Sequence, residues 1–265
     1  MSKLDRTNKS GSNRFSALVA AAGTGSRFSS QDQNSPKQTI DLCGYPLYIW
    51  SLISLSTNDD INKVVLVTGE SMLKEMTAQI DEIFTTNSLL RQSKKITVVT
   101  GGKTRQESVY QGLLSITNEP PEFVLVHDAA RPFLTNDLIA KVLQAVTARG
   151  ACTLAVPVAD TIKRVVDGSI ERTLDRSLLY AAHTPQAARY DWLLKAHKRA
   201  AREGREATDD AMLLEQDGHQ VAVVESSRYN LKVTIPEDLV LAKSFADEIL
   251  GQINDYARAH ANIKS

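Results

Sequence analysis

The sequence predicts an α/β fold: a mainly parallel sheet with helices on both faces and one projecting β-arm. Three observations lead to this class. Apolar, strand-like runs alternate along the chain with segments of helical spacing. Glycines or short polar motifs end several of these runs. One later segment, 160–180, interrupts the alternation with the pattern of a hairpin.

The first part of the chain supplies the alternating elements. Strands are predicted at 15–21, 63–69, 95–102, 122–132 and 151–158. Helices are predicted at 45–57, 71–84, 105–116 and 136–149, the first with Pro46 in its opening turn. After the arm come helices at 190–203 and 209–216, a short strand at 220–225, and a closing helix with Pro236 in its first turn. Ligands of such sheets bind at the carboxyl ends of the strands, so the polar motifs that follow strands should meet at one edge.

The arm and the chain ends define the domain organisation. The segment "DTIKRVVDGSIERTLDRSLLY" has a central Asp167-Gly168 pair between short β-like flanks, which predicts a hairpin. An arm of this kind could pack against a second copy of the chain. We find no linker, repeat or low-complexity tract, so residues 14–265 are predicted to form a single domain. Residues 1–13 are polar and are predicted to be a disordered tail.

Composition excludes several classes of function. The chain has 265 residues, with 31 Lys and Arg against 31 Asp and Glu, so its net charge is zero. Zero net charge argues against broad electrostatic capture of nucleic acid or of an anionic membrane. No apolar run approaches the length of a membrane span, and residues 1–13 lack a signal-peptide core. We expect a cytoplasmic protein without nucleic-acid or membrane partners.

A glycine turn follows the first predicted strand. Gly23 and Gly25 precede Arg27, and a polar run leads to Lys37, ten positions after Arg27. A dinucleotide fingerprint requires a third glycine where this chain has Phe28, and a Walker A loop is absent. A tight turn between a strand and a helix would explain the glycines alone. The two cations add a second interpretation, a backbone cradle for a triphosphate whose charge grows on a leaving pyrophosphate.

Two further motifs follow predicted strands. Gly101 and Gly102 allow close backbone approach, and Arg105 and Ser108 lie in the first turn of a helix, whose free amides favour nucleotide phosphates. A capped helix with solvated charges is the alternative.

The motif "HDAARP" ends the fourth predicted strand. Asp128 is predicted to lie near sugar hydroxyls or Mg²⁺, and Arg131 near an anionic substrate, although the two side chains could simply form an ion pair. We interpret His127 as a hydrogen-bonded structural residue rather than a base.

Several motifs together resemble a known family. In order they are "VAAAGTGSR" with "PKQ", "GGKTRQESVYQGL", "HDAARP", "PVADTIKR", "DRSLLYAAHTPQ" and "NLKVTIPEDL". They resemble the 2-C-methyl-D-erythritol 4-phosphate cytidylyltransferases of the non-mevalonate isoprenoid pathway, over about 15–246. The ribitol-5-phosphate cytidylyltransferases share most of the pattern, and "PVADTIKR" and "HTPQ" favour the erythritol enzyme. The resemblance implies a Rossmann-like nucleotidyltransferase fold, CTP as substrate, a divalent cation such as Mg²⁺, release of pyrophosphate, and a homodimer joined through the arm.

The resemblance also implies roles for individual residues. Arg27 and Lys37 match the residues that stabilise the transition state. Arg176 and Lys232 match those that hold the polyol phosphate, and Arg176 would reach the active site of the partner. The positions that match nucleotide contacts are Ala21, Ala22, Gly23, Gly25, Gly101, Gly102 and Ser108. The positions that match polyol-side contacts are Asp128, Arg131 and Thr161, and Asp128 is also the candidate metal ligand.

Two other function classes compete with this one. A nonenzymatic nucleotide-binding module would need the glycine cradle but not the cations Arg176 and Lys232 on the far side. A nicotinamide-dependent oxidoreductase is disfavoured by the missing third glycine. Three local departures from the family pattern are present. The loop of ten positions from Arg27 to Lys37 is longer than expected. Thr39 follows "PKQ", where an aromatic residue is common, and Tyr229 precedes Asn230, where a small or acidic residue is common.

Overall fold

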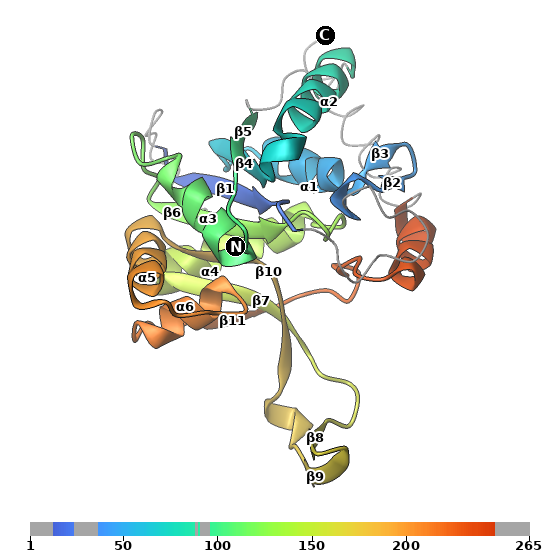
Figure 1. The fold of residues 1–265 in the computed structure, drawn as a ribbon, viewed down its shortest axis with the longest axis vertical. Helices are drawn as coiled ribbons and strands as arrows, with labels where there is room; N and C mark the ends of the chain where they lie inside the picture. Colours follow the sequence, from blue (N-terminus) through green and yellow to red (C-terminus); the bar gives the residue numbers. More distant parts are fainter. Residues whose placement is uncertain (1–12, 24–36, 88–89, 91–95, 247–265) are drawn as a thin grey trace, which may run out of the picture.

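A mixed seven-stranded sheet lies at the centre of the molecule (Figure 1). The computed structural model describes residues 13–23, 37–87, 90 and 96–246. The strands of the sheet are β1 (Phe15–Ala20), β4 (Lys63–Thr68), β5 (Ile96–Thr100), β6 (Phe123–Asp128), β7 (Ala151–Pro157), β10 (Tyr180–Arg189) and β11 (Ala222–Glu225). Their order is β11-β7-β10-β6-β1-β4-β5. Neighbouring strands are parallel except where β10 runs antiparallel to both β6 and β7, which confirms the mainly parallel sheet.

Helices cover both faces of the sheet. One face packs against α1 (Leu47–Ser56), α2 (Leu73–Thr86) and α4 (Asn136–Arg149), and the other against α3 (Arg105–Leu114), α5 (Tyr190–Glu203) and α6 (Asp210–Gln216). The alternation of side chains along β1 explains the two cores: Ala17 and Val19 enter the first apolar cluster, and Leu18 enters the second. Both faces of the central strands are therefore buried, as their near-continuous apolar sequences predict.

Local capping explains why some helix boundaries could be predicted closely. The hydroxyl of Thr135 accepts a hydrogen bond from the amide of Leu138 at the start of α4, and Gly150 ends the helix with a φ of 82°. A side chain at position 150 would also meet Trp192, because an added Cβ would lie 2.6 Å from the indole ring. The observed bounds of α4 and α5 equal the predicted ones, 136–149 and 190–203.

Four elements differ clearly from the prediction. Strand β6 ends at Asp128, whereas the strand was predicted to extend to Pro132. The region 45–57 begins as a short strand, β3 (Tyr45–Pro46), paired with β2 (Asp41–Leu42), and Pro46 caps α1 instead of lying within its first turn. The helix predicted from residue 71 opens with a 3-10 turn, η2 (Glu70–Met72). Strand β10 was not predicted at all. Its sequence contains Pro185, and its register with β7 shifts between His183 and Gln186, so it lacks the regular pattern of a strand.

The predicted arm projects from the body of the molecule (Figure 1). It contains β8 (Lys163–Val166), β9 (Ser169–Thr173) and the 3-10 turn η3 (Arg176–Leu178). Asp167 and Gly168 have φ angles of 48° and 77°, as a two-residue turn of the type favoured in hairpins requires. The arm exposes large apolar side chains, namely Val165, Val166, Ile170, Leu178 and Tyr180. The structure thus confirms the hairpin and shows an apolar surface on it.

The end of the described chain closes a third apolar cluster. Residues 236–246 are helical, and Ala242 packs in a cluster with Leu42, Trp50, Phe133 and Val233. Across the described ranges, no helix combines the length and the apolar character needed to cross a membrane. Except for Asn13, the predicted tail at 1–13 lies outside the described residues.

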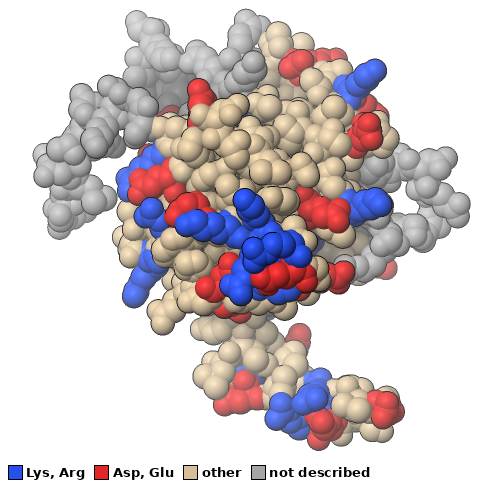
Figure 2. All heavy atoms as spheres, turned by 60° about the vertical axis from the view of Figure 1, so that its left-hand side comes forward, with Lys and Arg blue, Asp and Glu red and all other residues tan. Residues whose placement is uncertain are grey.

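Charges on the face formed by α5 and α6 are closely interleaved (Figure 2). Arg199 pairs with both Glu203 and Asp217, and Arg205 pairs with the same two carboxylates. Because basic and acidic groups alternate over this face, their fields largely cancel at a distance.

Candidate active site

The polar motifs meet at the carboxyl edge of the parallel strands. In the register of the sheet, Ala20 at the end of β1 lies opposite Asp128 at the end of β6. Past the strand ends, the Gly101 amide donates to the Thr68 carbonyl at 2.7 Å, and the Ala129 amide donates to the Ala20 carbonyl at 3.1 Å. For the described residues of the motifs, the predicted convergence is confirmed, at the point where the order of the parallel strands reverses around β1.

Asp128 lies between two cations from distant parts of the chain. Its Oδ1 accepts a hydrogen bond from Arg105 Nε at 3.0 Å, and its Oδ2 accepts one from Lys232 Nζ at 2.7 Å. Burial raises the pKa of the Asp128 carboxyl, but the charges of Arg105 and Lys232 outweigh burial and hold this pKa well below its usual range. The group is therefore a carboxylate at neutral pH, in a site that collects positive charge around it.

Arg105 has a second carboxylate partner that the sequence analysis missed. Its Nη2 donates to Asp210 Oδ2 at 2.7 Å, and Asp210 Oδ1 accepts from His197 Nε2 at 3.0 Å. The Asp210 side chain is only 2% exposed. Burial raises its pKa, yet the neighbouring Arg105 and His197 bring the pKa below the ordinary value. In the sequence, Asp209 and Asp210 indicate only the start of a helix: Asp209 caps α6 and Asp210 is its first residue, so the burial of Asp210 had no sequence signal.

A buried hydrogen-bond network supports Asp128 from below. The amide of Asp128 donates to the Thr184 hydroxyl at 2.9 Å, and that hydroxyl donates to His127 Nδ1 at 3.1 Å. The Nε2–H of His127 donates to the Arg131 carbonyl at 3.0 Å. Burial lowers the pKa of His127 to about 4, so the ring is neutral at physiological pH. These contacts agree with the interpretation of His127 as a structural residue.

Arg131 is buried but does not pair with Asp128. Its Nη1 donates to the Asn230 carbonyl at 2.7 Å and its Nη2 to the Ala182 carbonyl at 3.4 Å. Its Nε is buried without a hydrogen-bond partner in the described part of the chain. The alternative of a simple ion pair with Asp128 is therefore wrong for the described residues, where the ion-pair partners of Asp128 are Arg105 and Lys232.

The start of α3 is more closely packed than the sequence suggested. Glu107 and Thr104 form a capping box, and Glu107 also accepts a hydrogen bond from the Lys103 amide. The amide of Gly102 donates to the Ser108 hydroxyl at 3.1 Å. Local side chains thus satisfy several of the amides at this helix end, including that of Glu107, so only part of them can be free as expected. A Cβ added to Gly102 would lie 2.3 Å from Glu107 Cβ, so the glycine serves this packing.

The glycine turn after β1 is described only in part. Ala21, Ala22 and Gly23 continue from the end of β1, whereas Gly25 and Arg27 lie outside the described residues. The 3-10 turn η1 (Lys37–Thr39) lies beside this end of β1, because the Gln38 side chain donates to the Ala21 carbonyl. The backbone of Lys37 is therefore close to the predicted cradle, and its side chain lies outside what is described.

Two predicted site residues lie in the arm, which leaves the sheet at the carboxyl end of β7. Arg176 is in the arm, where its Nη1 donates to the Ala159 carbonyl, and Thr161 is exposed at the base of the arm. Figure 1 shows the arm extending away from the strand ends that carry Asp128. One chain alone thus brings together Asp128, Arg105 and Lys232, but not Arg176.

The described acids offer little for a metal ion. No cluster of three or more His, Cys, Asp or Glu side chains in the described ranges could hold a metal. Asp128 is the ionised carboxylate at the strand ends, and one or two carboxylates combined with substrate phosphates are a common way to bind Mg²⁺. The residues present therefore fit a metal held mainly by phosphate oxygens with Asp128 as a protein ligand.

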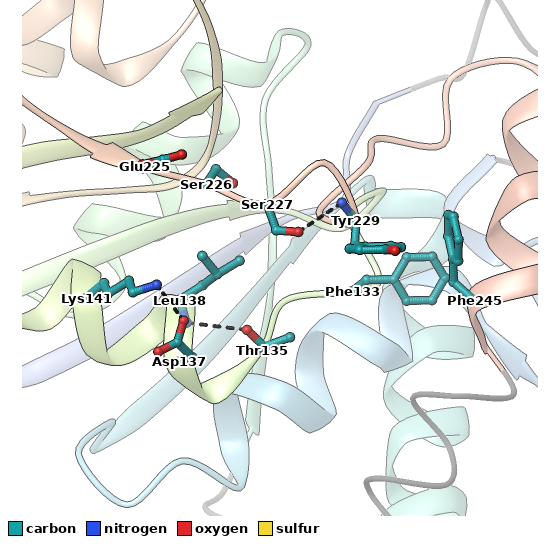
Figure 3. Close-up of a pocket in the computed structure, with 10 residues that line it drawn as sticks. All are labelled: Phe133, Thr135, Asp137, Leu138, Lys141, Glu225, Ser226, Ser227, Tyr229 and Phe245. Carbon is teal, nitrogen blue, oxygen red and sulfur yellow. Dashed lines mark hydrogen bonds and ion pairs between the residues drawn. The ribbon is translucent and has the colours of Figure 1, made fainter. Parts of the chain in front are cut away.

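A cavity of about 580 Å³ lies near this edge but contains none of the predicted site residues (Figure 3). Its walls come from the start of α4, the end of β11 and the helix of residues 236–246, and include Phe133, Lys141, Ser226, Tyr229 and Phe245. The segment that carries Ser226 and Tyr229 continues to Lys232. The same segment therefore borders the cavity and contributes Lys232 to the candidate active site.

A carboxylate held between cations at the strand ends of a Rossmann-like sheet fits an α/β nucleotidyltransferase, an enzyme that brings anionic substrates together. The family model "IspD: 2-C-methyl-D-erythritol 4-phosphate cytidylyltransferase" matches residues 15–248, and the chain belongs to this family. A 2-C-methyl-D-erythritol 4-phosphate cytidylyltransferase of Bacillus velezensis is 39% identical over 244 residues, which cover 91% of this chain and 99% of the relative. The enzyme of that name from Aquifex aeolicus is 40% identical over 86% of this chain and 96% of the relative.

Solved structures agree with this family. The 4-diphosphocytidyl-2C-methyl-D-erythritol synthase of Anaerococcus prevotii has a TM-score of 0.75 at 25% identity, over 89% of this chain and 96% of the neighbour. The 2-C-methyl-D-erythritol 4-phosphate cytidylyltransferase of Thermus thermophilus has a TM-score of 0.68 at 30% identity, over 88% of this chain and 98% of the neighbour. The Rossmann-like nucleotidyltransferase fold is confirmed.

Proposed function

We propose that this chain transfers a cytidylyl group from CTP to 2-C-methyl-D-erythritol 4-phosphate. The products are 4-diphosphocytidyl-2-C-methyl-D-erythritol, an isoprenoid precursor, and pyrophosphate. The match to the family over residues 15–248 carries this proposal. The carboxylate of Asp128 between Arg105 and Lys232 at the strand ends supports it, because the site concentrates charge where two anionic substrates must meet.

The reaction requires no protein base. The nucleophile is a phosphate monoester whose second pKa is about 6, so it is already mostly dianionic near pH 7. An oxygen of this phosphate attacks the α-phosphorus of CTP, and the bond to the leaving pyrophosphate breaks. The difficulty is to bring one anion up to another. Cations that position both and neutralise the growing charge supply most of the rate enhancement.

We assign the roles of the cations by where charge develops. Arg27 and Lys37 would face the triphosphate from the loop after β1, where charge grows on the leaving pyrophosphate. Lys232 and Arg131 would face the polyol phosphate. The remaining nucleotide contacts would come from the turns after β1 and β5, with Arg105 and Ser108 at the start of α3. A divalent cation such as Mg²⁺, with Asp128 as its protein ligand, would neutralise phosphate charge when bound.

We propose a homodimer formed through the arm at 160–180. The support is the exposed apolar surface of the arm, since large exposed apolar patches mark interaction sites. In such a dimer, Arg176 and Thr161 would face the active site of the partner subunit. The cytoplasmic location and the absence of nucleic-acid partners stay predictions, as does the organisation into one domain with a disordered tail.

Release of pyrophosphate tests the reaction and its substrate together. Purified protein with Mg²⁺ and CTP should release pyrophosphate with 2-C-methyl-D-erythritol 4-phosphate, and much less with ribitol 5-phosphate or with ATP in place of CTP. A Lys37→Ala variant serves as the control for contaminating activity. A preference for ribitol 5-phosphate would reassign the substrate, and release with neither polyol phosphate would contradict the proposal.

Complementation between two inactive variants tests the role of the arm. Arg176→Ala and Lys37→Ala should each be inactive alone but recover activity after their subunits exchange, because a mixed dimer has one site with both intact residues. With random exchange about half of the dimers are mixed, so roughly a quarter of the wild-type activity should return, for independent sites in a two-fold dimer. If complete exchange restores nothing, Arg176 does not act across the dimer.

A further inference from the structure

Lys232 is carried by a segment without helix or strand. Residues 226–235 connect β11 to the helix of residues 236–246 through turns and extended chain. The ammonium of Lys232 still lies 2.7 Å from Asp128 Oδ2. Because a lysine side chain is long and flexible, the position of its ammonium depends on how firmly the backbone near it is held. The contacts that fix this segment therefore decide where the charge lies.

Asn230 is one of two side chains that tie the segment to β10; the other is Ser226, whose hydroxyl lies 3.1 Å from His183 Nδ1. The Nδ2 of Asn230 donates to the Thr184 carbonyl at 2.9 Å and, more weakly, to the Ser226 hydroxyl at 3.4 Å. The backbone carbonyl of Asn230 accepts the 2.7 Å hydrogen bond from Arg131 Nη1. Asn230 is completely buried. Figure 3 shows its neighbours Ser226 and Tyr229 on the side of the segment that faces the cavity.

Thr184 links Asn230 to the partner of Lys232. The hydroxyl of Thr184 accepts the Asp128 amide at 2.9 Å, and its carbonyl accepts the Asn230 side chain. Asp128 and the segment of Lys232 are thus held by the same residue of β10. The contacts close a ring from Asp128 through Thr184, Asn230 and Lys232 back to the carboxylate of Asp128. Moving any member of this ring displaces the ammonium relative to the carboxylate.

Among the described residues, the side-chain amide of Asn230 acts as a hydrogen-bond donor and not as an acceptor. Its Oδ1 is buried and has no hydrogen-bond partner in the part of the chain that the structure describes. An unsatisfied buried acceptor costs free energy, so the oxygen does not explain why an amide stands at this position. The two contacts made by Nδ2 do explain it, and both hold the backbone from which Lys232 extends.

We propose that Asn230 is a positioning residue that places Lys232, and with it the polyol phosphate, opposite Asp128. This inference rests on the proposed function, in which Lys232 binds the polyol phosphate. Asn230 does not touch the substrate and acts through Lys232. Its loss should therefore weaken polyol phosphate binding and slow turnover, while the Michaelis constant for CTP stays near that of the wild type.

A double-mutant cycle tests the proposal. In the wild-type background, Asn230→Ala should raise the Michaelis constant for 2-C-methyl-D-erythritol 4-phosphate roughly tenfold, the effect of one or two lost hydrogen bonds. In a Lys232→Ala background the same change should have almost no effect on this constant. Asn230 would act through Lys232, so the effects of the two substitutions should not add. Asn62→Ala is the matched control: Asn62 accepts two backbone amides at the opposite end of β1. It should lower thermal stability without changing either Michaelis constant.

The outcomes separate this inference from the proposed function. If Lys232→Ala leaves the constant for the polyol phosphate unchanged, the role of Lys232 fails and the inference fails with it. If Lys232→Ala raises that constant but Asn230→Ala does not, or if Asn230→Ala acts equally in both backgrounds, only the positioning role is wrong. All variants are assayed at a temperature where circular dichroism shows them folded. If Asn230→Ala does not fold, Asn230→Ser replaces it, because a serine is too short to reach the Thr184 carbonyl.

Discussion

Replacing Arg105 by methionine removes the cation shared by two carboxylates while keeping most of the apolar stem. Among the described residues, the Asp210 carboxylate would then retain His197 as its partner, and the Asp128 carboxylate would retain Lys232. Removing one partner of a buried ion pair costs about 3–5 kcal/mol. Because the Arg105 side chain is 27% exposed and both carboxylates keep one contact, we expect the lower end, about 3 kcal/mol. In a domain of this size that loss lowers the Tm by about 6–12 °C.

The dependence on pH distinguishes lost charge pairing from lost packing. In the wild type, neighbouring cations hold the pKa values of Asp128 and Asp210 below the ordinary value. The two ionised carboxylates therefore contribute stability that is complete above about pH 4, the pKa of a carboxyl in the unfolded chain. This stability is lost as the pH falls through the lower pKa values of the folded state. Arg105→Met lacks the part of this contribution that Arg105 supplies, while Lys232 and His197 stay in place. Its deficit in unfolding free energy should therefore be largest at pH 7 and should shrink as the pH falls below about 4.

Urea unfolding followed by tryptophan fluorescence at several pH values measures both effects. Arg199→Met is the matched control, since Arg199 also bridges two carboxylates, Glu203 and Asp217, but its side chain is 51% exposed. Surface pairs of this kind contribute little, so the control should leave the unfolding midpoint nearly unchanged. An Arg105→Met variant as stable as the control, or with a deficit that does not depend on pH, would refute the assignment of a buried charge network.

Three further outcomes are expected. Arg27→Ala and Lys37→Ala should each lower the turnover rate by a factor of about 10²–10³, because both cations should meet charge that develops during transfer. The affinity for CTP, measured by titration, should stay nearly unchanged. Near-normal turnover at saturating substrate would exclude this role. Deletion of residues 163–174 should give a monomer by light scattering, and an intact dimer would exclude the arm as the interface. Gly102→Ala should lower the unfolding free energy by about 1–3 kcal/mol through overpacking against the start of α3. Gly23→Ala should not, because the described residues leave open space around Gly23; equal effects of the two in urea unfolding would contradict the packing argument.

Elements with local signals could be predicted closely from the sequence. The bounds of α4 follow from a capping threonine and a left-handed Gly150, both visible as residue types. The hairpin of the arm follows from Asp167-Gly168. Strand β10 lacks such a signal, because its pairing with β6 and β7 depends on long-range contacts around an irregular stretch at Pro185.

In the candidate site, too, residues in sequence motifs could be predicted, whereas long-range contacts could not. Asp128 and Lys232 could be proposed from motifs, and the structure places them 2.7 Å apart. The motifs did not reveal that Arg105 is shared with Asp210, because these residues are 105 positions apart and meet only through packing of α3 against α5 and α6. The anchoring role of Asn230 likewise depends on a carbonyl of the unpredicted strand β10.

The two ends of the arm are neighbours in the sheet. Pro157 at the end of β7 lies opposite Tyr180 at the start of β10, and the Val158 amide donates to the Leu179 carbonyl at 3.0 Å. A tight two-residue turn can join antiparallel strands at such a point. The arm is thus an insertion between two strand ends that are already paired. We expect that the arm can be shortened at this point while the strands of the sheet keep their register.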